Sequence, residues 1–80
     1  MRDVLPELQE VFRDVLDDPT LQIDRHSGTT NVRGWDSLAH VTLLAAIQQQ
    51  FGIRIAVGEI AQLTDVGAIL DLLERKRAQP

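Results

Sequence analysis

The sequence predicts an all-α fold, a small bundle of three main helices plus one short helix, with a long loop between the first and second helices. Three segments show apolar residues at three- and four-residue steps, and residues that start or end helices bound each of them. Residues 53–55 alternate between apolar and charged side chains, but this run is too short to predict a strand. Residues 1–80 are therefore expected to form a single domain around one small core.

The first helix is expected from Asp3 to Leu16. Its acidic side chains fall opposite an apolar stripe, which consists of Leu5, Leu8, Val11, Phe12, Val15 and Leu16. Pro6 is compatible with this helix because it lies in the first turn, where its missing N–H removes no hydrogen bond. The sequence Asp17-Asp18-Pro19 should end the helix.

The next segment, residues 20–33, has no sustained hydrophobic period. Compact domains keep loops of this length only for a packing or functional reason. Leu21, Ile23 and Val32 are expected to pin the loop to the core, and residues 27–31 supply turn-forming side chains between them.

The second helix is expected from Ser37 to Phe51 and should end at Gly52. Its core-facing arc is expected to contain Val41, Leu43, Leu44, Ile47 and Phe51, while Gln48, Gln49 and Gln50 should face solvent.

Two helical segments should follow the second helix. Residues 57–63 can form one or two helical turns. Thr64-Asp65 should cap a last helix, with Arg75, Lys76 and Arg77 near its C-terminal end, where the helix dipole favours cations. The core side of that helix should consist of Val66, Ile69, Leu70, Leu72 and Leu73.

Composition excludes several classes of function. Twelve acidic against eight basic residues give a net charge of −4, which disfavours binding to nucleic acids or to anionic lipid. The chain has no cysteine, so it forms no disulfide and cannot itself hold a cysteine thioester. It shows neither a signal peptide nor an apolar stretch of transmembrane length. We therefore expect a monomeric, cytoplasmic protein.

Ser37 has two possible roles at the start of the second helix. It can cap the helix, or Asp36 can cap it one residue earlier, because both residue types are preferred caps and neither is followed three residues later by Glu or Gln. If Asp36 is the cap, the Ser37 hydroxyl is free at a helix start, where backbone N–H groups and the dipole favour a phosphate. The sequence leaves both roles open.

The second helix has an uncharged outer side. Leu38 points away from the core arc, and Thr42, Ala45 and Gln49 share its side. No charged residue occurs between Ser37 and Ile53, although 25% of the chain is charged. This pattern suits a partner that binds by shape, apolar contact and amide hydrogen bonds, but a surface that merely tolerates neutral residues would look the same.

Neither a metal site nor a catalytic triad is predicted. His26 and His40 are the only two histidines, and without cysteine a zinc site would need at least two well-placed carboxylates. Ser37, His40 and Asp36 lie within one helical turn, so the acid cannot orient the imidazole behind the serine. His40 is expected to pack at the rim of the core and Trp35 to bury one face under the loop.

The motifs G-W-D-S-L at residues 34–38, F-G-I at 51–53 and D-V-G at 65–67 resemble those of an acyl carrier protein of the phosphopantetheine-binding superfamily. The resemblance covers nearly the whole chain. It implies that a phosphopantetheinyl transferase attaches 4′-phosphopantetheine from coenzyme A to Ser37. Acyl intermediates would then be held as thioesters and presented to acyl-loading, elongating or offloading enzymes, while the chain itself is not an enzyme.

The resemblance also assigns residues that partners recognise. Asp36 matches the acid of the motif and Leu38 the leucine that partners contact, and we add Ala45 and Gln49 from the uncharged side of the second helix.

Departures from the family pattern bear on the pathway. Carriers of bacterial fatty acid synthesis usually have acids where this sequence has Thr42, Gln48 and Gln49, and peptidyl carriers usually have G-G where this sequence has Gly34-Trp35. The motif is more similar to that of free-standing carriers of polyketide or other specialised pathways. Two alternatives stay open: a peptidyl or aminoacyl carrier of a nonribosomal pathway, and an unmodified helical protein-interaction module in which Ser37 is only a cap.

Overall fold

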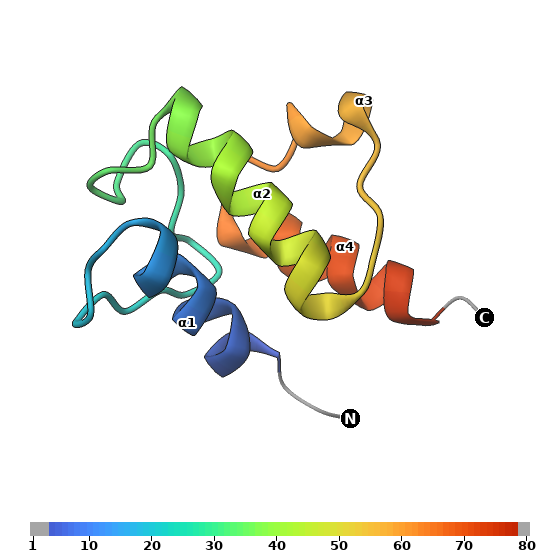
Figure 1. The fold of residues 1–80 in the computed structure, drawn as a ribbon, viewed down its shortest axis with the longest axis horizontal. Helices are drawn as coiled ribbons and strands as arrows, with labels where there is room; N and C mark the ends of the chain where they lie inside the picture. The colour runs from blue at the N-terminus through green and yellow to red at the C-terminus, as the bar shows by residue number, and fades with distance from the viewer. Residues whose placement is uncertain (1–3, 79–80) are drawn as a thin grey trace.

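The structure is a computed structural model, and it describes residues 4–78. Its four helices are α1 (Leu5–Val15), α2 (Ser37–Phe51), α3 (Val57–Ile60) and α4 (Val66–Ala78). In Figure 1, α2 crosses in front of α4, α1 lies to one side, and the short α3 lies near the end at which α2 begins. This arrangement confirms the predicted all-α bundle and the long loop between the first two main helices.

The C-terminal end of the first helix comes one residue earlier than expected. Its last helical residue is Val15, and Leu16 is the C-cap. Asp17 adopts a φ of 52°, a left-handed conformation that cannot continue a right-handed helix. Pro6 lies in the first turn, as predicted. The expected first residue, Asp3, lies outside the described residues.

The long loop is fastened to the start of α4 by backbone hydrogen bonds. The Thr29 N–H donates to Thr64 O (3.0 Å), and the Val66 N–H donates to Ser27 O (2.7 Å). The two segments come so close that a Cβ on Gly28 would lie 3.0 Å from the Thr64 carbonyl oxygen. Of the predicted apolar contacts of this loop, two side chains are buried and one is half-buried, namely Ile23, Val32 and Leu21.

The core is formed by α1, α2, α4 and apolar residues of the connecting segments. Its fully buried larger side chains are Phe12, Leu8, Leu43, Leu44, Ile47, Ile69, Leu72, Leu73 and Val66. The predicted arc of α2 was too wide: Val41 is 60% exposed and Phe51 is only half-buried. Val41 lies on the outer side of α2 with Leu38 and Ala45, which are also exposed, and Phe51 is the last residue of the helix.

The glutamines of α2 do not all face solvent. Gln49 and Gln50 are exposed, but Gln48 is half-buried. Its Oε1 accepts the Ile55 N–H (2.8 Å), and its Nε2 donates to Leu44 O (3.3 Å). Gln48 therefore holds the segment that follows α2, and its assignment to the solvent side was wrong.

The elements after α2 follow the prediction. Gly52 caps α2 at a φ of 65°, and residues 53–55 form no strand. The third helix forms one turn, Val57–Ile60, which is the shorter of the two lengths expected within residues 57–63. Asp65 caps α4 as expected, because its Oδ1 accepts the Ala68 N–H (2.7 Å).

Candidate functional site

The start of α2 resolves the two roles that the sequence left open for Ser37. Asp36 is the N-cap: its backbone is extended, and its Oδ1 accepts the Ala39 N–H (2.9 Å). Ser37 is then the first helical residue, and it is exposed. Within residues 4–78 its hydroxyl has no hydrogen-bond partner. The side chain thus presents a free hydroxyl at a helix N-terminus.

The loop before Ser37 is anchored by Trp35. Its side chain is only 3% exposed, and its ring meets the Phe12 ring edge-on, with 5.0 Å between the ring centres. The Trp35 Nε1–H donates to His40 Nδ1 (2.9 Å), and His40 Nε2 lies 2.8 Å from Ile60 O. These contacts confirm the expected packing of Trp35 and the place of His40 at the rim of the core. Trp35 directly precedes the Asp36 cap in the chain.

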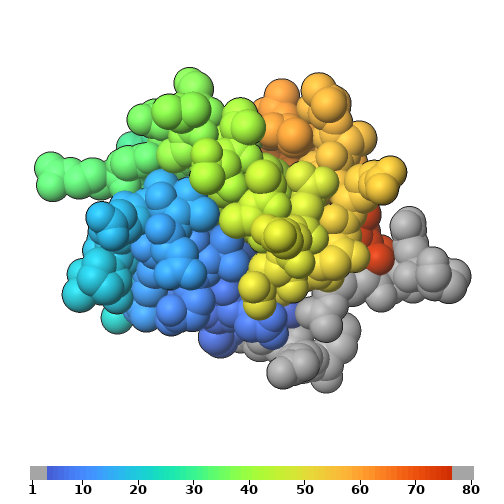
Figure 2. All heavy atoms as spheres, viewed as in Figure 1, coloured from blue at the N-terminus to red at the C-terminus, as the bar shows by residue number. Residues whose placement is uncertain are grey.

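The uncharged outer side of α2 is accessible next to Ser37. Leu38 is 79% exposed, which confirms that it points away from the core, and Thr42, Ala45 and Gln49 are exposed as well. Figure 2 shows the surface of α2, in green and yellow, open to solvent between α1 and α3. The neutral residues predicted for partner contact are therefore available to a partner.

Two exposed apolar residues near this site were not identified from the sequence. Val41 of α2 is 60% exposed and Val57 of α3 is 86% exposed. Val41 was assigned to the core arc, and α3 is too short for a hydrophobic period to show which side of it is buried. Their exposure adds apolar surface on the two helices that His40 links.

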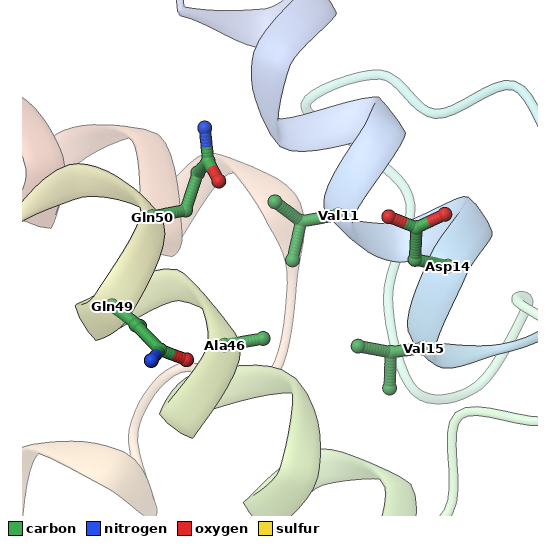
Figure 3. Close-up of a pocket in the computed structure, with 6 residues that line it drawn as sticks. All are labelled: Val11, Asp14, Val15, Ala46, Gln49 and Gln50. Carbon is green, nitrogen blue, oxygen red and sulfur yellow. The ribbon is translucent and has the colours of Figure 1, made fainter.

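A separate shallow groove lies between α1 and α2. Its volume is about 210 Å³, and Figure 3 shows Ala46 of α2 pointing toward Val11 and Val15 of α1. The lining residues are Val11, Asp14, Val15, Ala46, Gln49 and Gln50. Sites for small molecules usually enclose about 300 to 1,000 Å³. The groove lies along the second half of α2, away from Ser37, and of the residues predicted to contact partners it contains Gln49.

The structure offers no arrangement for catalysis or metal binding at this position. The His40 ring nitrogens are engaged by Trp35 and Ile60, so the imidazole does not stand behind the Ser37 hydroxyl. In the part of the chain that the structure describes, no three His, Cys, Asp or Glu side chains are grouped to hold a metal ion. None of the described helices combines the length and apolar character that crossing a membrane requires.

Comparison with known proteins decides the family. The sequence pattern of the family described as "Phosphopantetheine attachment site" matches residues 6–73. The chain is 30% identical over 71 residues to the acyl carrier protein of Acidothermus cellulolyticus, an alignment that covers 89% of this chain and 84% of that protein. The chain belongs to the acyl carrier protein family.

A solved structure supports the same assignment. The solution NMR structure of the holo acyl carrier protein from Geobacter metallireducens superposes with a TM-score of 0.85 and is 33% identical, covering 94% of this chain and 86% of that one. These matches confirm the predicted carrier function and the covalent 4′-phosphopantetheine cofactor. Proteins of this family are not catalysts; they are substrates of a phosphopantetheinyl transferase and of acyl-handling enzymes.

The start of α2 fits an attached phosphate group. The Ser37 hydroxyl is exposed and unengaged, so a bond to it would displace no contact within the described residues. The 15-residue helix begins at Ser37, and its dipole and first backbone N–H groups stabilise negative charge there.

Proposed function

We propose that Ser37 is the attachment site of phosphopantetheine in this carrier. The observation that carries the proposal is the division of roles at the start of α2: Asp36 caps the helix, which leaves the Ser37 hydroxyl exposed and free at the N-terminus. The residue also lies in the D-S-L triplet of the family motif.

Other hydroxyl groups of the described chain are less suited. Three of them are engaged: Ser27 Oγ accepts the Asp24 N–H (2.9 Å), Thr20 Oγ1 donates to Asp18 Oδ1 (3.2 Å), and Thr42 Oγ1 donates to Leu38 O (3.3 Å). The remaining ones, Thr29, Thr30 and Thr64, lie in loops and not at a helix start. Ser37 therefore combines a free hydroxyl with a favourable field for phosphate.

The loading reaction uses Ser37 as the nucleophile. Its Oγ attacks the phosphorus of coenzyme A that bears the pantetheine arm, so an O–P bond forms and the pyrophosphate bond breaks. The nucleotide part leaves as adenosine 3′,5′-bisphosphate, and the hydroxyl proton passes to a base of the transferase. Once attached, the arm supplies the thiol that this cysteine-free chain lacks, and acyl groups are carried on it as thioesters.

We propose that partner enzymes recognise Asp36, Leu38, Ala45 and Gln49. One oxygen of the Asp36 carboxylate caps α2 and the other is not used by the cap. Leu38 offers a large exposed apolar side chain one residue after Ser37. Ala45 and Gln49 extend the neutral surface along the helix, so contact here would rest on shape and amide hydrogen bonds.

The pathway proposal rests on the sequence pattern. We propose a monomeric, cytoplasmic carrier of a polyketide or other specialised pathway, with acyl-loading, elongating and offloading enzymes as partners. The G-W-D-S-L form and the absence of charge on α2 support this subclass. Assays of loading with acyl donors of several classes, together with sedimentation of the purified protein, test the pathway and the oligomeric state.

Intact mass spectrometry tests the attachment site. The purified apo protein is incubated with coenzyme A and a broad-specificity transferase, and we expect it to gain the mass of one phosphopantetheine. The Ser37→Ala variant should gain none while keeping the helical circular dichroism of the parent. The matched control is Thr42→Ala, an exposed hydroxyl of the same helix, which should still be loaded. Loading of folded Ser37→Ala would overturn the proposal.

A further inference from the structure

Trp35, His40 and Ile60 form a hydrogen-bonded relay that joins three segments of the carrier. Trp35 belongs to the loop before Ser37, His40 to α2 and Ile60 to α3. The distances are 2.9 Å from Trp35 Nε1 to His40 Nδ1 and 2.8 Å from His40 Nε2 to Ile60 O. The indole and imidazole rings also stack, with 5.9 Å between their centres and 26° between their planes.

The two partners of His40 determine where its proton resides. An indole N–H can only donate and a backbone carbonyl can only accept. His40 must therefore accept at Nδ1 and donate from Nε2, which assigns the neutral imidazole with its proton on Nε2. A protonated ring would carry N–H groups on both nitrogens, so its Nδ1–H would face the Trp35 N–H, a second donor. The complete relay exists only while His40 is neutral.

Protonation of His40 affects the two hydrogen bonds unequally. The bond to Ile60 O survives because Nε2 keeps its proton, and a charged donor strengthens it. The bond from Trp35 is lost because Nδ1 no longer accepts. The loop side of the relay should therefore open while the α3 side stays attached to α2.

We propose that His40 is a positioning residue that, in its neutral form, holds the Trp35 loop against α2 and so presents Ser37 to the loading enzyme. Trp35 directly precedes the Asp36 cap, so release of the indole loosens the backbone from which the Ser37 helix starts. Acidification then detaches this loop without unfolding the domain. The effect on loading rests on the proposed role of Ser37, whereas the conformational response of Trp35 does not.

The charged groups around His40 do not offset its protonation. The loop contributes Asp36, whose Oδ1 is used by the Ala39 N–H, and α3 contributes Glu59, which binds the Ala56 N–H and Lys76 of α4. The α1 helix reaches the relay through the Phe12 ring, and α2 has no charged residue. Among the described residues His40 forms no ion pair, so no existing ion pair takes the place of the Trp35 bond when Nδ1 stops accepting.

NMR of the full apo chain between pH 8 and pH 5.5 tests the proposal. The chain has one tryptophan and two histidines, so the Trp35 indole N–H and both imidazole rings can be followed separately. We expect the indole N–H to shift along the titration curve of His40 and its exchange with solvent to accelerate about 2- to 12-fold beyond the effect of pH itself. This range corresponds to one hydrogen bond of about 0.5 to 1.5 kcal/mol.

Two histidine variants identify the responsible group. His40→Gln can still donate to Ile60 O but does not titrate, so the pH response of the indole should disappear. His26→Gln is the matched control, because His26 is an exposed loop residue, and the response should persist in it. An indole that stays unchanged while His40 titrates, or that follows His26 instead, would overturn the relay.

Loading kinetics test the positioning role. For each protein the transferase KM is measured at pH 8 and pH 6, and the ratio to His40→Gln removes the pH dependence of the enzyme itself. The ratio of the parent KM to the His40→Gln KM should rise on acidification, with little change in kcat. The same ratio for Trp35→Phe should stay constant, because this variant keeps a ring against Phe12 but has no indole N–H. A pH-independent ratio for the parent would refute the positioning role. If Ser37 were not the attachment site, the mass experiment and the predicted effect on loading would both fail, whereas the indole response would remain.

Discussion

Glu59 of α3 and Lys76 in the last turn of α4 form an ion pair, with 3.2 Å between Oε1 and Nζ. The same carboxylate oxygen accepts the Ala56 N–H (2.9 Å) at the start of α3. Together the Ala56 N–H, which is the larger cause, and Lys76 lower the pKa of Glu59 below its ordinary value. The Glu59 carboxylate thus stabilises the N-terminus of the one-turn helix α3 and connects this helix to α4.

The Glu59→Gln variant should lose more stability at neutral pH than in acid. A carboxyl group whose pKa is lower in the folded than in the unfolded state stabilises the fold above the ordinary pKa, about 4.3 for glutamate, and this contribution disappears as the pH falls through the folded value. Urea unfolding of both proteins at pH 7 and pH 3 measures the difference, which should shrink in acid. Glu10→Gln is the control, because Glu10 forms only an exposed pair with Arg13. A difference that did not vary with pH would contradict the role of the Glu59 charge.

The Asp36→Ala and Ser37→Ala variants should differ in stability although they are neighbours. Asp36 accepts the Ala39 N–H, and removal of such a cap costs about 0.5 to 2 kcal/mol in free energy of unfolding. Ser37→Ala removes a hydroxyl without a partner in the described chain and should stay within about 0.5 kcal/mol of the parent. Denaturant unfolding of the apo proteins distinguishes them. Equal losses would mean that the Ser37 hydroxyl contributes to the cap.

The Leu38→Ala and Ile47→Ala variants separate partner contact from folding. Ile47 is fully buried, and its truncation should lower the free energy of unfolding by about 2 to 5 kcal/mol. Leu38 is 79% exposed, so its truncation should cost less than about 0.5 kcal/mol while raising the KM of the transferase. Thermal unfolding and loading kinetics on the same preparations provide both measurements. Normal loading of Leu38→Ala would remove Leu38 from the partner surface.

The sequence was sufficient to predict the elements whose causes are local. A hydrophobic period identified α1, α2 and α4, and the caps at Gly52 and Asp65 each follow from the preference of one residue type for one helix position. The exposure of Leu38 could be predicted because it lies opposite the core arc on the helical wheel. These features depend on residues close together in the chain.

Features that depend on tertiary contacts were beyond such reasoning. Val41 is exposed because no neighbouring element covers it, and Gln48 turns inward to bind the Ile55 N–H. A helical wheel contains neither kind of information. The relay through His40 requires that α3 place the Ile60 carbonyl near the start of α2. The identities of residues 40 and 60 do not indicate this contact, because it is made by a backbone carbonyl 20 residues away in the chain. The free state of the Ser37 hydroxyl became clear only when the cap was seen to be Asp36.

Recognition of the carrier by its cognate enzyme should depend only weakly on salt. Charged surfaces attract each other over roughly a Debye length, about 10 Å at 0.1 M salt, so an acidic carrier helix would lose affinity steeply as salt rises. Here α2 has no charged residue, and Glu59 is already paired with Lys76, which leaves Asp36 as the nearby acid. Affinity of the holo protein for its enzyme should therefore fall only slightly between low and physiological ionic strength, as measured by titration calorimetry.

Adding a negative charge to α2 should produce the salt dependence that the parent lacks. Gln49 is exposed, so Gln49→Glu adds a charge without disturbing the contacts that Gln48 makes inside the fold. This variant should bind its own enzyme less well and acquire a steeper salt dependence, while enzymes with basic docking surfaces should accept it better than the parent. A charge-neutral control at the same position, Gln49→Ala, should leave the salt dependence unchanged. A steep salt dependence already present in the parent would contradict this prediction and would mean that charges outside α2, such as Glu7 and Asp14 of α1, carry the contact.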